Sequence, residues 1–183
     1  MRVYYRSGYV PWWGWYSPDV LDVDHPGRMV GGGEAGMLET AFGMAARGHA
    51  VRVYACSQPG EYRGVVFRTE RSFYPDVLDD PPDAVVAWSD PVPLQFVPPP
   101  AKRIFAQQLN DLGFPPGWDR FADAMVSPSW NHAEYMKSLG WSGPIFAVHN
   151  GCRTQLWADA PAPRDRPMRV SYWSSPDRGL HHV

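Results

Sequence analysis

The sequence predicts an α/β domain built on a Rossmann-like parallel sheet with helices on both faces. Short apolar runs of strand length recur between turn clusters through residues 1–151, and they are nearly continuous rather than alternating. This pattern is typical of strands that are buried on both faces. A glycine run at 31–33 opens an amphipathic helix that leads into a short strand rich in Val and Tyr, which is the repeating unit of an open parallel sheet.

The first strand is expected at 2–5, and the first helix is expected to follow the glycine run. Its apolar residues recur at steps of three and four, which places one stripe against a core; the stripe is Met37, Leu38, Ala41, Phe42 and Ala45. Gly48 is expected to end this helix as its C′ residue, before a strand at 51–54.

Five further strands and one more helix are expected in the first domain. The strands are expected at 65–67, 84–88, 103–106, 124–127 and 145–148. The helix begins at Ser129, a typical N-cap residue, and has Ala133 and Met136 on one face, with its stop marked by Leu139 or Gly140. Strand, capped turn, helix and strand therefore repeat along the chain.

The composition changes after residue 151. Three prolines with charged residues among them follow Ala160, as in an exposed linker between domains. A new strand and a strand-to-helix turn follow at 168–183, and they are too short to bury a core of their own. We therefore expect a first domain at 1–151, a linker at 152–167, and at 168–183 the incomplete start of a second Rossmann-like domain.

Charge and cysteine content narrow the classes of partner. The net charge is −2 and only Lys102 and Lys137 are lysines, so the sequence does not predict a basic face for nucleic acid. Cys56 and Cys152 are isolated, which favours reduced thiols in a cytoplasmic protein. The six histidines are scattered, and the adjacent pair His181 and His182 lacks a third ligand, so no metal site is expected.

An aromatic segment at 9–16 contains Trp12 and Trp13 and reads as a loop after the first strand. Such a loop could stack on a sugar or a base, contact a membrane interface at the periphery, or pack on its own core. No run reaches the about 18 apolar residues that a membrane-spanning helix needs.

The glycine run itself indicates a site for an anion. A helix that begins on glycines presents bare N–H groups and the positive end of its dipole to a ligand. Gly31, Gly33 and Gly36 also satisfy the dinucleotide pattern G-x-G-x-x-G. The segment before them is polar and broken by proline, and no acid ends the next strand, so a nicotinamide or flavin cofactor is not expected.

Three segments, taken in order, resemble a known enzyme family. The first joins the glycine run and Glu34 to A-A-R-G-H-x-V-R-V-Y at 45–54; the second joins S-P-S-W at 127–130 to V-H-N-G at 148–151; the third is Y-W-S-S-P-D-R-G-L at 172–180. Together they resemble the large family of retaining GT-B glycosyltransferases that includes sucrose and mannosyl transferases.

The resemblance implies a fold of two Rossmann-like domains facing a cleft, with a nucleotide-sugar donor held mainly by the second domain and a saccharide or other hydroxyl acceptor by the first. It implies no bound metal and no cofactor, since the nucleotide-sugar is a substrate. The donor diphosphate would contact Gly32 and Gly33 from one side and Ser174, Ser175 and Arg178 from the other.

The remaining residues that the resemblance implicates lie on the acceptor side. Asn110 and Asp111 follow the strand at 103–106 and are the catalytic candidates, with Asn110 standing where family members often carry a histidine. Trp12, Trp13 and Glu34 are the acceptor-side candidates.

Acidic donor-side residues of the family would lie beyond Val183, so the chain is expected to be a truncated form that is inactive alone. Two alternatives stay open: a sugar-nucleotide epimerase of the same architecture, and a non-catalytic carbohydrate-binding fragment that uses the aromatic segment.

Overall fold

A computed structural model describes residues 1–7, 32–55, 59–108, 113–149 and 151. The chain divides into two units, Met1–Asn150 and Gly151–Val183. The expected linker at 152–167 and the expected start of a second domain at 168–183 lie outside the described residues, and both stay predictions.

The first unit is built on a sheet of eight strands in the order β3-β4-β2-β1-β5-β6-β7-β8, in which only the β3–β4 pair is antiparallel. The strands are β1 (Arg2–Ser7), β2 (Ala50–Tyr54), β3 (Gly60–Tyr62), β4 (Val65–Arg68), β5 (Ala84–Trp88), β6 (Lys102–Ala106), β7 (Ala124–Ser127) and β8 (Ile145–Ala147). The helices are α1 (Gly32–Ala46), α2 (Phe73–Asp79) and α3 (Trp130–Ser138), with short 3-10 turns η1 (Glu70–Ser72), η2 (Val92–Phe96) and η3 (Trp118–Arg120). The predicted α/β class and parallel sheet are confirmed.

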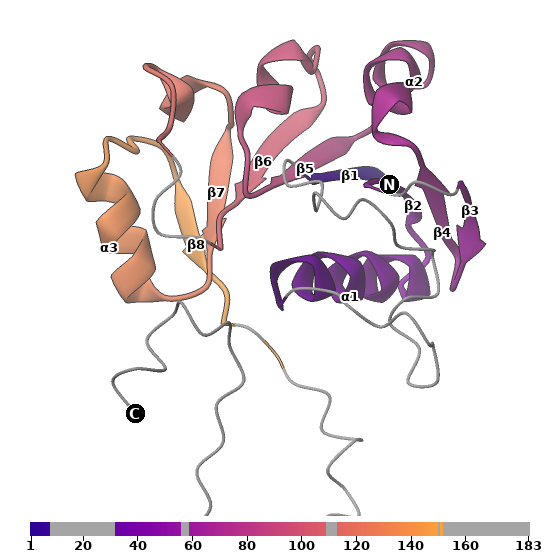
Figure 1. The fold of residues 1–183 in the computed structure, drawn as a ribbon, viewed down its shortest axis with the longest axis horizontal. Coiled ribbons are helices and arrows are strands. Elements are labelled where there is room, and N and C mark those ends of the chain that lie inside the picture. The colour runs from indigo at the N-terminus through magenta and orange to yellow at the C-terminus, as the bar shows by residue number, and fades with distance from the viewer. Residues whose placement is uncertain (8–31, 56–58, 109–112, 150, 152–183) are drawn as a thin grey trace, which may run out of the picture. The chain divides into compact units, whose positions relative to one another are not determined.

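Helices cover both faces of this sheet, as predicted. In Figure 1 α1 lies on one side of the strands and α2 on the other. Alternate residues of each central strand point to opposite faces, so Val3 and Tyr5 of β1 pack with α1. Tyr4, between them, belongs to the buried cluster on the other face, which also contains residues of α2 and α3. The apolar stripe of α1 is confirmed: four of its five residues are buried and Ala45 packs against them.

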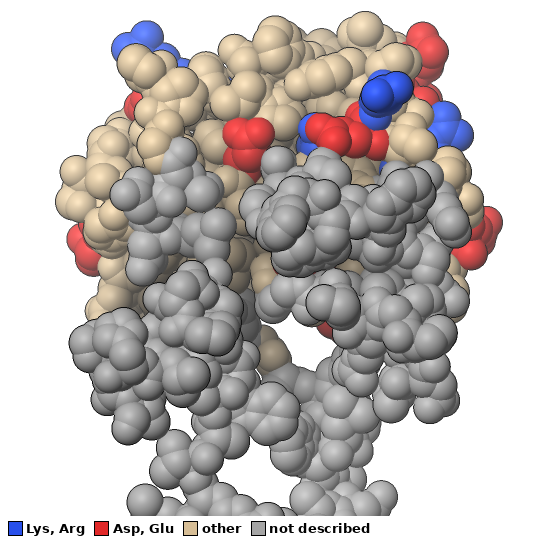
Figure 2. All heavy atoms as spheres, in the orientation of Figure 1, with Lys and Arg blue, Asp and Glu red and all other residues tan. Residues whose placement is uncertain are grey.

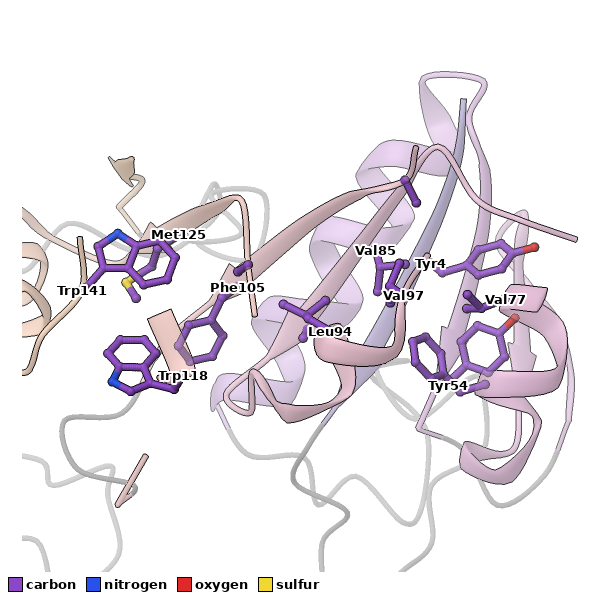
Figure 3. Packing of buried hydrophobic residues seen from close by; sticks show 14 of the residues in the cluster. Tyr4, Tyr54, Val77, Val85, Leu94, Val97, Phe105, Trp118, Met125 and Trp141 are labelled. Carbon is purple, nitrogen blue, oxygen red and sulfur yellow. The ribbon is translucent and has the colours of Figure 1, made fainter. Parts of the chain in front are cut away.

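Large side chains fill the second face (Figure 3). Phe105 of β6 is fully buried and meets the rings of Phe114 and Trp118 edge-on, with centroids 5.8 and 5.9 Å away. Trp118 in turn lies 5.5 Å from Trp141, which follows α3. This aromatic group anchors η3 and the end of α3 to β6 and β7.

Both long helices end in the same motif. Gly48 has φ +83° and its N–H donates to Ala45 O at 2.9 Å, while His49 N–H reaches Met44 O at 3.3 Å. This is a Schellman motif, which confirms Gly48 as the C′ residue of α1. Gly140, with φ +102°, closes α3 in the same way.

The start of α3 is also confirmed. Ser129 Oγ accepts a hydrogen bond from His132 N at 3.1 Å, as an N-cap does. Ala133 and Met136 are buried, but Leu139 is 39% exposed and does not belong to that buried face.

Three features differ from the sequence prediction. β3 and β4 form a hairpin whose two loop residues, Arg63 and Gly64, both have positive φ, the geometry of a type I′ turn. α2 was not expected, because it is short and carries Pro75. The apolar run at 145–148 is not buried on both faces, since Phe146 is 58% and Val148 is 56% exposed.

Candidate functional site

The candidate site lies where the strand order of the sheet reverses. β1 has β2 on one side and β5 on the other; the chain leaves β1 through α1 to reach β2 and returns later to β5. Open α/β sheets bind ligands at such a point, outside the carboxyl ends of the strands. Ser7 ends β1 and is paired in register with Trp88, which ends β5.

The N-terminus of α1 supplies the first part of the site. Gly32 and Gly33 open the helix and Glu34 is the acid of its first turn. The first N–H groups of a helix have no partner within the helix, and the dipole makes this end positive. These residues lie in one helical turn, and Gly33 and Glu34 are partly exposed. The arrangement can bind a phosphate or another anion.

Trp88 supplies the second part, although the sequence pattern predicts it only as one residue of an apolar strand. Its side chain is 8% exposed and packs in the core on the α1 face of the sheet. A Cβ placed on Gly33 would lie 3.7 Å from Trp88 Nε1, and one on Gly36 would lie 3.3 Å from Trp88 Cζ2. The edge of the indole therefore runs along the first turn of α1, with its nitrogen beside Gly33. Nε1 has no hydrogen-bond partner within the described residues.

The residue after Trp88 fixes the turn at the end of β5. Ser89 has φ +66°, which a residue other than glycine rarely adopts. Its N–H donates to Ala106 O at 2.9 Å, and Asp90 Oδ1 accepts from Val92 N at 2.9 Å. These bonds hold the chain in a sharp turn directly after the indole. Such strained positions cluster at functional sites.

A second polar group lies at the ends of β6 and β7. Gln107 is fully buried; its Oε1 accepts from Gln108 N at 3.1 Å, and its Nε2 lacks a partner in the part of the chain that is described. Ser127 Oγ lies 2.7 Å from Nδ1 of His132 and also contacts Ser129 O at 3.1 Å. These contacts tie the start of α3 to the end of β7.

Gly32, Gly33 and Glu34 lie together in the first turn of α1, and their roles at the phosphate and at the acceptor stay predictions. Seven other candidates lie outside the described residues and stay predictions: Trp12, Trp13, Asn110, Asp111, Ser174, Ser175 and Arg178. Gln107, which was not among the predicted site residues, directly follows β6 and precedes the predicted pair Asn110 and Asp111 in the sequence. No local signal in the sequence separates Gln107 or Trp88 from ordinary strand residues.

Acidic and basic side chains are interspersed on the face shown in Figure 2. Many of the described cations are paired with carboxylates, for example Arg103 with Asp123 at 2.7 Å and Arg52 with Asp80 at 2.6 Å.

Within the described ranges, no group of three or more His, Cys, Asp or Glu side chains is placed so that it could hold a metal ion. Every helix of those same ranges is too short or too polar to cross a membrane.

No protein-family model matches this sequence, and no curated protein matches it.

The close contact between Trp88 and α1 gives a test of the site geometry. Gly43→Ala is expected to raise the free energy of unfolding by about 1 kcal/mol, because alanine is the better helix former and the new Cβ would meet only the end of the Arg47 side chain, at 3.5 Å. Gly36→Ala makes the same change in the same helix but presses on the buried indole. It is expected to leave the protein about 1–3 kcal/mol less stable than Gly43→Ala.

Urea unfolding of the two variants measures this difference. Equal stabilisation by both alanines would show that the indole does not lie against the first turn of α1.

Proposed function

We propose that this chain is the acceptor-side domain of a nucleotide-sugar-dependent glycosyltransferase of the retaining GT-B type. The observation that carries the proposal is the start of α1 on Gly32 and Gly33 at the strand-order reversal of a parallel sheet. A diphosphate fits such a helix start because backbone N–H groups can bind its oxygens. The motif order along the sequence supports this enzyme class.

Transfer of a sugar requires that the charge growing on the leaving diphosphate be stabilised and that the acceptor oxygen be held beside the anomeric carbon. In the proposal, the N–H groups of Gly32 and Gly33 donate to the diphosphate from the first domain. Arg178, with Ser174 and Ser175, binds the same diphosphate from the second domain, because a guanidinium matches phosphate oxygens.

The acceptor is assigned to the first domain. Trp12 and Trp13 would stack against the apolar face of a sugar ring, and the Glu34 carboxylate would accept hydrogen bonds from its hydroxyls. Asn110 and Asp111 would lie near the reacting oxygen, because they come after β6 in the sequence and open α/β sheets bind ligands beyond the carboxyl ends of their strands.

A binding experiment on the full chain tests the proposal. Uridine, guanosine and adenosine diphosphates are titrated and followed by saturation-transfer NMR, and a panel of saccharides is titrated in parallel. We expect at least one nucleoside diphosphate to bind, Gly33→Val to weaken that binding about tenfold or more, and Gly43→Ala to leave it unchanged. Trp13→Ala is expected to change saccharide preference without affecting the nucleotide.

Two outcomes would contradict the glycosyltransferase proposal. Saccharide binding that survives Gly33→Val and is lost in Trp13→Ala, without any nucleotide binding, would indicate a carbohydrate-binding fragment. Conversion of a nucleotide-sugar to its epimer, with no acceptor present, would indicate an epimerase of the same architecture.

A further inference from the structure

We propose that the indole N–H of Trp88 is a side-chain donor to the anion bound at the N-terminus of α1. The inference rests on the proposed function for the identity of that anion, a phosphate or diphosphate. It adds a residue to the site that neither the glycine pattern nor the family resemblance assigns.

The first support is the state of the nitrogen. Trp88 is 8% exposed, and its Nε1 has no hydrogen-bond partner among the described residues. A buried N–H without an acceptor destabilises a protein, so each such group calls for an explanation. A ligand that brings an oxygen to this nitrogen supplies one.

The second support is the direction in which the nitrogen lies. Nε1 is 3.7 Å from the position that a Cβ on Gly33 would take, while Cζ2 is 3.3 Å from that of Gly36. The nitrogen is thus at the end of the ring edge that faces the start of α1. Because Gly33 has no side chain, nothing of this residue stands between the helix N–H groups and the indole nitrogen, and one oxygen at the start of α1 would accept from both.

The chemistry of these groups selects the ligand class. Backbone N–H groups and an indole N–H donate hydrogen bonds and cannot accept them, so the ligand must present several acceptors. The positive end of the helix dipole further favours a negative charge. A phosphate or diphosphate meets both requirements, whereas a cation meets neither.

Trp141 provides a matched comparison within the same chain. Its Nε1 is also buried without a partner among the residues described, and its side chain is 4% exposed. It packs on the opposite face of the sheet, after the C-terminal end of α3. Trp88→Phe and Trp141→Phe therefore remove the same kind of buried N–H, but only the first removes it beside a helix N-terminus.

The experiment titrates the ¹⁵N-labelled full chain with inorganic pyrophosphate at constant ionic strength and follows the indole N–H signals of its nine tryptophans. The signal that disappears in Trp88→Phe assigns Trp88. We expect this signal to move saturably downfield. Trp88→Phe is expected to weaken pyrophosphate binding about tenfold, or about 1.4 kcal/mol, and Trp141→Phe to leave it unchanged.

A second variant, Gly33→Ala, keeps the proposal testable if Trp88→Phe does not fold. Gly33→Ala adds a methyl group in ordinary contact with the indole nitrogen, at 3.7 Å, so the fold tolerates it while the space between helix and indole is filled. It is expected to weaken pyrophosphate binding and to abolish the shift of the Trp88 signal. Circular dichroism confirms that each variant is folded.

The outcomes separate this inference from the proposed function. Pyrophosphate binding with an unmoved Trp88 signal, or with equal affinity in Trp88→Phe, would overturn the inference and leave the glycosyltransferase proposal standing. Absence of saturable pyrophosphate binding would also overturn it. A shifted Trp88 signal in a chain that binds neither nucleoside diphosphates nor saccharides would support the inference and contradict the proposed function.

Discussion

Phe105→Ala is expected to lower the free energy of unfolding by about 3–5 kcal/mol. Phe105 is fully buried near the carboxyl end of β6 and packs edge-on against Phe114 and Trp118. Truncation removes its buried apolar surface, leaves a cavity under η3, and ends both edge-to-face contacts. The cavity cannot close easily, because Trp118 is itself held at 5.5 Å from Trp141.

Phe146→Ala is the matched control, since it removes the same side chain from the same sheet. Phe146 lies on β8 at the end of the strand order and is 58% exposed, so its loss is expected to cost less than about 0.5 kcal/mol. Urea unfolding of both variants gives the two values. Similar losses in the two would show that Phe105 does not fill the core described above.

The local pattern of the sequence was sufficient to predict much of the fold. The apolar runs at 84–88 and 124–127 became β5 and β7 with the same bounds, because a buried parallel strand leaves a continuous apolar run in the sequence. The stripe of α1, Gly48 at its end and Ser129 at the start of α3 followed from helix periodicity and capping. In each of these cases the interaction that decides the structure involves residues close together in the chain.

The parts that could not be predicted depend on contacts between distant residues. In the sequence, Trp88 is indistinguishable from the other apolar residues of its strand. Only the packing of β5 against α1 places its indole nitrogen beside Gly33. The apolar run predicts that Phe146 and Val148 are buried, but β8, which contains Phe146 and ends just before Val148, is the last strand in the sheet order. The glycines of the candidate site were thus visible in the sequence, whereas its tryptophan required the structure.

Raising the pH from 9 to 12 is expected to destabilise the protein through its buried tyrosines. Burial raises the pKa of Tyr5 from 10.0 to about 12. Burial also raises the pKa of Tyr4 to about 12, against the opposing charge of Arg52 and with a hydrogen bond to Asp80. Burial also raises the pKa of Tyr54, and the Tyr54 hydroxyl donates a hydrogen bond to Asp76 Oδ2 at 2.9 Å.

The sign follows from proton binding. Between pH 10 and 12 the folded state keeps phenol protons that the unfolded state releases, so stability falls as the pH rises. The stability of the folded state is therefore fully retained below about pH 10, and the part that depends on the protonated phenols is lost as the pH rises through their folded-state pKa. For Tyr5, a rise of about two pKa units corresponds to about 3 kcal/mol.

Tyr5→Phe isolates this contribution, because it removes the titrating hydroxyl and keeps the ring that packs with α1. Urea unfolding of the wild type and the variant at pH 8, 10, 11 and 12 measures it. The variant is expected to lose about 2 kcal/mol less than the wild type between pH 8 and 12, because a phenol with a folded-state pKa of about 12 is only half ionised at pH 12. Parallel curves for the two proteins would mean that the Tyr5 hydroxyl ionises as readily in the folded chain as in the unfolded one, and that the α1 face of β1 admits water.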